Sequence, residues 1–129
     1  MFRVTFLFAV VLAVLAVVSQ AANIEARGNK HHGTATFYSV KHSGKPSCGY
    51  KADNDDMVAA LSHKRMPKHG HGKPCGEKVK VHYKKKSITV KVIDTCDGCG
   101  RNDIDLSPAA FKKLDHKKKG ELKVQWEFK

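Results

Sequence analysis

Hydrophobic and polar residues alternate along several stretches of the chain, which predicts a protein built mostly from β-strands. Every second side chain is apolar in residues 77–83 (EKVKVHY), and the same period returns in residues 88–94 (ITVKVID) after a short lysine-rich turn. Two such runs joined by a tight turn predict an antiparallel hairpin. Residues 121–128 (ELKVQWEF) predict a closing strand, with Trp126 and Phe128 on its buried face, so Trp126 is expected in the core rather than as a platform for a sugar ring.

The remaining elements are shorter. Residues 33–40 (GTATFYSV) carry the β-branched and aromatic side chains typical of a strand, and residues 57–61 predict a short buried strand, followed by a helical turn that Pro67 ends. Ser107 followed by a proline predicts the N-cap of one short helix over residues 108–116. We see no internal repeat in the pattern.

Asp94 is the strongest single candidate for a functional residue. The apolar parity of its strand runs from Ile88 through Val90 and Val92 to this carboxylate, so a regular strand would deliver Asp94 to the edge of the core. The structural alternative is an aspartate that begins a turn and accepts backbone hydrogen bonds.

The N-terminal segment has the pattern of a secretory signal. Arg3 precedes a continuous apolar run over residues 5–18, and small residues suited to cleavage follow it. This run is shorter than the stretch of about 20 residues that spans a membrane. We therefore expect a signal peptide over residues 1–21, a flexible leader over residues 22–32 and one domain over residues 33–129, secreted to the extracellular space or the cell wall.

The charge is strongly basic, with 24 Lys and Arg against 12 Asp and Glu and a formal net charge of +12. Such a field attracts polyanions and opposes self-association, so a monomer is expected. The lysines gather in runs at residues 84–86 and 117–119, which are equally typical of a solvated surface. No nucleic-acid recognition motif accompanies them, so nucleic acid is not an expected partner.

Four cysteines in a small secreted domain are typical of two disulfides and no free thiol. The Cys96-x-x-Cys99 spacing is also compatible with a metal site or a redox motif. A zinc site would need a second such pair, whereas Cys48 and Cys75 stand alone. A redox motif would need a helix N-terminus, whereas this one follows a strand, so neither a metal nor another cofactor is expected.

Several segments together resemble a known family. They are GTATFYSV, SCGYKADNDDMVAALS, PCGEKVKVHY, ITVKVIDTCDGCGRNDIDLSPAAFKKL and GELKVQWEF, and they run in this order from about residue 33 to 128. The pattern resembles the double-psi β-barrel domain of expansins, barwin, fungal loosenins and rare lipoprotein A, with the small single-domain fungal proteins as the nearest type. The resemblance implies a mainly β protein with a six-stranded barrel, one or two short helices, two disulfides and an open groove.

The same resemblance suggests residue roles. Asp94 matches the groove aspartate, which is the general acid in lytic members and is needed for wall loosening in expansins. Tyr38 matches a groove tyrosine, Thr36 is its neighbour on the same strand face, and Asp105 matches the acid of the DLS segment. These four residues are the predicted glycan-binding set.

The resemblance also implies disulfides between Cys48 and Cys75 and between Cys96 and Cys99. Two features depart from the lytic relatives. The second carboxylate of barwin-like endoglucanases is replaced by residues 39–41 (SVK), and the histidine of the lipoprotein type does not follow the Ala-Ala pair directly, which leaves His63 displaced. An enzyme is therefore not expected, and Asp94 would be the catalytic group if any lytic activity survived.

These observations together predict a secreted protein that binds wall polysaccharide (chitin, cellulose or an acidic glycan) and loosens it without hydrolysis, with the lysines holding it to acidic polymers. Two alternatives stay open at this point. One is a protease inhibitor or secreted effector that binds a protein target through the barrel. The other is a weak glycan-cleaving enzyme that relies on Asp94 alone.

Overall fold

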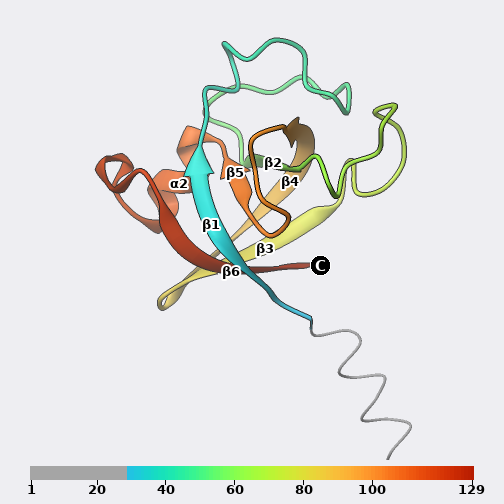
Figure 1. Cartoon of the computed structure of the whole chain (residues 1–129). Helices are drawn as coiled ribbons and strands as arrows, with labels where there is room; N and C mark the ends of the chain where they lie inside the picture. The colour runs from blue at the N-terminus through green and yellow to red at the C-terminus, as the bar shows by residue number, and fades with distance from the viewer. Residues whose placement is uncertain (1–28) are drawn as a thin grey trace, which may run out of the picture.

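The computed structural model describes residues 29–129, and these form a closed six-stranded barrel with one helix and one 3-10 turn (Figure 1). The predicted signal peptide and the predicted leader up to residue 28 lie outside the described residues. The elements are β1 (His31–Phe37), β2 (Val58–Ser62), β3 (Lys78–Tyr83), β4 (Lys86–Cys96), β5 (Ile104–Leu106), α2 (Pro108–Leu114), η1 (Lys117–Lys119) and β6 (Leu122–Phe128).

The order of strands around the barrel is β1-β5-β2-β4-β3-β6. The predicted hairpin is confirmed, since β3 and β4 pair antiparallel from Lys78 opposite Lys91 to Tyr83 opposite Lys86. Two other pairs, β1 with β5 and β2 with β4, are parallel. A parallel pair needs a crossover connection, so the chain between paired strands must cross one end of the barrel.

Two long loops, residues 38–57 and 63–77, connect β1 to β2 and β2 to β3. In Figure 1 they lie above the barrel, whereas the β3–β4 hairpin extends toward the lower left. The two ends of the molecule therefore carry different kinds of structure, irregular loops at one and a tight hairpin at the other.

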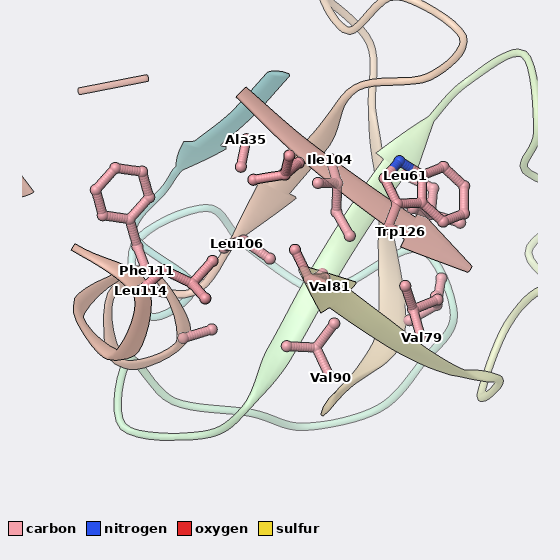
Figure 2. Packing of buried hydrophobic residues seen from close by; sticks show 14 of the residues in the cluster. Ala35, Leu61, Val79, Val81, Val90, Ile104, Leu106, Phe111, Leu114 and Trp126 are labelled. Carbon is pink, nitrogen blue, oxygen red and sulfur yellow. The ribbon is translucent and has the colours of Figure 1, made fainter. Parts of the chain in front are cut away.

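One main core fills the barrel (Figure 2). It is lined by the inward residues of all six strands and closed on one side by helix α2, whose Phe111 packs against Phe37 with ring centroids 4.9 Å apart. Trp126 is fully buried, as predicted, and its indole Nε1 donates a hydrogen bond of 2.8 Å to the carbonyl oxygen of Asn102. A buried indole with a satisfied N–H stabilises the core without the penalty of an unpaired donor.

The helix forms where its capping residues predict it. The Ser107 hydroxyl accepts a hydrogen bond of 3.2 Å from the backbone N–H of Ala110, and Pro108 occupies the first turn. The helix ends at Leu114, two residues before the predicted end. None of the described helices is long and apolar enough to cross a membrane.

Three local predictions were wrong. β1 begins at His31, inside the predicted leader, because His31 pairs with Trp126 on β6 and stacks on its indole at 4.4 Å. Phe128 follows the buried parity of β6 but is 38% exposed, since it lies at the last residue of the strand, at the end of the barrel. Residues 63–65 form a turn closed by a hydrogen bond from the Arg65 N–H to the Ser62 carbonyl, residue 66 is a bend, and no helix forms before Pro67.

Candidate functional site

A β-bulge in β4 decides where Asp94 points. Ala59 on β2 pairs with Val92, but the next residue of β2, Ala60, pairs with Asp94. Ile93 is therefore an extra residue in β4. A bulge of this kind shifts the alternation of side chains by one position. Val92 belongs to the main core, while Asp94 faces the outer side of the barrel beside Ala60. The prediction that Asp94 continues the buried face of β4 is therefore wrong.

The same outer side carries a second, smaller apolar cluster. It consists of Val40, Val58 and Ile93, with Tyr38 packed against it. The bulge thus places an apolar side chain, Ile93, directly before the carboxylate of Asp94. An apolar surface therefore lies next to the charged group of the site.

Asp94 is held in place by the first long loop. Its Oδ1 accepts hydrogen bonds from the backbone N–H groups of Ser47, at 2.9 Å, and Thr95, at 2.8 Å. The Ser47 and Thr95 hydroxyls are hydrogen-bonded to each other at 2.8 Å, and the Cys48 N–H donates to the Ile93 carbonyl. Within the described part of the chain Oδ2 accepts no hydrogen bond, so one carboxylate oxygen is anchored and the other is free for a ligand.

Both predicted disulfides are present. Cys48 is bonded to Cys75, with Cα atoms 5.5 Å apart, and Cys96 to Cys99, with Cα atoms 5.4 Å apart. The first bond joins the two long loops to each other directly beside Ser47. The loop that orients Asp94 is therefore covalently tied to its neighbour.

Two carboxylates flank one small residue. Ala60 pairs with Asp94 on one side and with Asp105 on the other, since β2 lies between β4 and β5. Asp105 is also opposite Thr36 on β1, and its Oδ1 accepts a hydrogen bond of 2.9 Å from the Thr36 hydroxyl. Burial, together with the negative charge of Asp94, raises the pKa of Asp105, and the Thr36 hydrogen bond opposes that rise.

Tyr38 lies next to this pair of carboxylates. Its backbone N–H donates to the Leu106 carbonyl, which continues the pairing of β1 with β5. Its phenolic oxygen is buried and has no hydrogen-bond partner among the described residues. Burial, and then the charges of Asp94 and Asp105, raise the pKa of Tyr38 well above its ordinary value of 10.0. The phenol therefore stays protonated and offers an unpaired donor.

A hollow of about 720 Å³ opens beside Asp94. Its wall comes from both long loops and from the end of β4, and it includes Lys45, His63 and Lys68. Asp94 is the one member of the predicted glycan-binding set that lines it. Thr36, Tyr38 and Asp105 lie on the same outer face but not in the wall of this hollow.

His63 does not follow the Ala-Ala pair directly, so the sequence does not predict it as the histidine of the lytic relatives. In the structure it nevertheless lines the same hollow as Asp94. The parallel pairing of β2 with β4 explains this position. Ser62, the residue before His63, is opposite Cys96, two residues after Asp94, and the His63 N–H donates to the Cys96 carbonyl. The parallel pairing of β2 with β4 is therefore the information that would predict that His63 and Asp94 lie near each other. No group of three or more metal-binding side chains occurs in residues 29–129.

The closed six-stranded barrel with two parallel pairs is the fold of the double-psi β-barrels. Residues 30–126 match the family model of this RlpA-like domain, described as lytic transglycolase, and the chain belongs to that family. The resemblance drawn from the sequence is confirmed.

Curated relatives fall into two size groups. The papain inhibitor of Streptomyces mobaraensis is 35% identical over 104 residues, which cover 78% of this chain and 73% of the relative. The Allergen Asp f 7 homolog of Arthroderma benhamiae is 34% identical over 91 residues, which cover 69% of this chain and 31% of the relative. Expansin-like protein 3 of Dictyostelium discoideum is 35% identical over 100 residues, which cover 69% of this chain and 28% of the relative. The chain thus spans about a third or less of the last two proteins.

The solved structures fall into the same two groups, one close to this chain in length and one much longer. The Streptomyces papain inhibitor superposes with a TM-score of 0.70 at 33% identity, over 78% of this chain and 94% of that one. A mutant Clavibacter michiganensis expansin in complex with cellohexaose superposes with a TM-score of 0.68 at 26% identity, over 78% of this chain and 50% of that one.

Proposed function

We propose that the protein is a secreted, expansin-like protein that binds wall polysaccharide on the outer face of β1, β5, β2 and β4 and loosens it without hydrolysis. The observation that carries this proposal is the arrangement around Ala60, where two carboxylates from neighbouring strands lie beside the unpaired phenol of Tyr38. A sugar chain presents hydroxyls that can donate to the free carboxylate oxygen of Asp94, and apolar ring faces that can pack on the Tyr38 side chain. The expansin that superposes on this chain is described in complex with a cellulose fragment, which supports the same ligand class.

The chemistry of loosening follows from competition between hydrogen bonds. Asp94 Oδ2 would accept from a sugar hydroxyl that otherwise pairs with a neighbouring chain, and the Tyr38 ring would pack beside the sugar. Glycosidic hydrolysis requires two carboxylates on either side of the bond. Asp105 is bonded to Thr36 and does not line the hollow beside Asp94, whereas Asp97 does line it, so the measurement of released sugar described below is what separates loosening from cleavage.

The test is a set of binding isotherms on insoluble chitin and cellulose at low and high salt, with reducing ends measured in the same tubes. The variant Asp94→Asn keeps an acceptor for the Ser47 and Thr95 N–H groups but converts the free oxygen into a donor. Asp55→Asn, on an exposed loop residue, is the matched control. A hydrogen bond to a charged group contributes about 1.5–3 kcal/mol, so Asp94→Asn should weaken binding about tenfold or more.

The proposal requires that the Asp55 control binds like the wild type, that binding survives high salt and that no sugar is released. Equal binding by wild type and Asp94→Asn would contradict the role of the groove. Release of reducing ends that depends on Asp94 would instead support the glycan-cleaving alternative.

A specific observation favours a second candidate function, a protease inhibitor. The papain inhibitor is close to this chain in length and superposes over 94% of its own residues, whereas the expansins extend well beyond the matched region. Residual activity of papain, titrated with this protein at nanomolar to micromolar concentrations, tests this function directly. Inhibition that is unchanged in Asp94→Asn would place the protease contact outside the groove.

A further inference from the structure

A second hollow lies on the other side of the barrel from Asp94. It has a volume of about 590 Å³ and is walled by residues of β1, β6 and β3 and the chain next to them. In the ring of strands, β6 stands between β1 and β3, while Asp105 on β5 and Asp94 on β4 lie on either side of β2 in the opposite half. Figure 1 shows β1, β6 and β3 together, below the long loops. This second hollow is therefore separate from the proposed groove.

The second hollow is strongly basic. Lys30, Lys84 and Lys123 line it together with the imidazoles of His32 and His82, and the described residues of its wall include no carboxylate. Glu127 lies just outside, where its Oε1 pairs with His82 Nε2 at 3.0 Å. None of the three lysines forms a direct ion pair with a residue in the described range, although the charge of Lys30 acts on the nearby carboxylate of Glu127.

The basic surface continues around the hairpin. Lys84 also lines a neighbouring hollow of about 380 Å³ beside the end of helix α2, where Lys85 and Lys86 outnumber the one carboxylate, Asp115. Lys84 therefore connects two basic depressions that lie next to each other. Such a strip suits an extended anionic polymer better than a single small anion, because several charges along one chain can be engaged at once.

The chemistry of the wall distinguishes among polyanions. Binding of single-stranded nucleic acid relies on several aromatic side chains on which successive bases stack, and Tyr83, in the smaller hollow, is the one Phe, Tyr or Trp among the described residues that line the two hollows. Insertion into a lipid surface relies on large exposed apolar side chains, whereas the two aliphatic residues among the described residues that line these hollows, Val124 and Leu114, are buried in the main core. Thr34 and Gln125 add neutral donors and acceptors beside the lysines, which suits a ligand that carries hydroxyls as well as charges.

We propose that this second hollow binds a carboxylated polysaccharide of the polygalacturonate type. The lysines would pair with its carboxylates, while Thr34 and Gln125 would bond to its hydroxyls. The inference deepens the proposed function and rests on it for the ligand class, a glycan. Its consequence is that the protein has two glycan-binding surfaces on opposite sides, and so can bridge an acidic polymer to a second polysaccharide held at Asp94.

The experiment is a calorimetric titration of the purified protein with soluble polygalacturonate at moderate salt. The test variant carries Lys30→Gln, Lys84→Gln and Lys123→Gln. The matched control carries Lys41→Gln, Lys51→Gln and Lys64→Gln, which removes the same charge from exposed residues outside the three hollows. An exposed charge contact contributes roughly a factor of three, so the test variant should bind about 30-fold more weakly while the control stays within about threefold of the wild type.

If both variants lost the same affinity for polygalacturonate, the proposal would be overturned, because binding would then depend on the net charge of the protein and not on the lysines of the second hollow. No binding of polygalacturonate by the wild type would overturn it as well. So would tighter binding of single-stranded DNA or of phosphatidylserine vesicles through the same three lysines. Asp94→Asn is expected to bind polygalacturonate like the wild type, so failure of the groove proposal and failure of this one give different results.

Discussion

The disulfide between Cys48 and Cys75 should contribute far more to stability than the one between Cys96 and Cys99. The perturbation is the paired substitution Cys48→Ser with Cys75→Ser, compared with the paired substitution at Cys96 and Cys99. Both pairs replace two sulfur atoms by two hydroxyls. They differ in the length of chain that each bond closes, since the sequence separations are 27 and 3 residues.

The magnitude follows from the entropy that a crosslink removes from the unfolded chain. For a separation of 27 residues this entropy corresponds to about 3.5 kcal/mol at 25 °C, and for a separation of 3 to about 1.6 kcal/mol. A domain of this size is stable by about 5–15 kcal/mol, so loss of the first bond removes a large share of the total. Loss of the second should leave the protein folded under ordinary conditions.

The assay is urea unfolding of the two variants and the wild type at one temperature and pH, with the free energy of unfolding extrapolated to zero urea. Amide hydrogen exchange at Ser47 supplies a second readout. The loop that donates this N–H to Asp94 is tied by Cys48, so exchange at Ser47 should speed up in the first variant by more than the loss of global stability explains.

The reasoning would be refuted if the two variants lost equal stability, or if the Cys96 and Cys99 pair cost more. Unchanged local exchange at Ser47 in the first variant would separately refute the idea that the disulfide orders the loop around Asp94.

Two further predictions concern titratable groups. Thr36→Val removes the hydrogen bond that opposes the effect of burial, so the pKa of Asp105 should rise further, which a carbon-13 carboxyl titration measures; a fall would contradict the assigned causes. Burial and the charge of Arg65 lower the pKa of His31, so the unfolded chain takes up a proton near pH 6.5 before the folded state does. The free energy of unfolding should therefore fall as the pH drops below about 6.5, until the folded imidazole is protonated as well, and this dependence should flatten in His31→Gln when measured by urea unfolding across that range.

Much of the fold could be predicted because it depends on local order along the chain. The alternation in residues 77–83 and 88–94 defines a hairpin whichever protein contains it, and the Ser107-Pro108 pair defines a helix start through its own hydrogen bonds. Trp126 was correctly expected in the core from the parity of its strand. The barrel and the disulfides came from the resemblance to a family rather than from these patterns.

The sequence by itself thus predicted five of the six strands, all except the short β5, and where the helix begins. Only the tertiary structure decided that Ile93 is an extra residue in β4, which turns Asp94 away from the core and toward Asp105 across Ala60. It also brought His63 into the wall of the same hollow. The physical reason is that side-chain parity belongs to one strand, whereas a bulge and a parallel register are set by the partner strand, and that partner lies far away in the sequence.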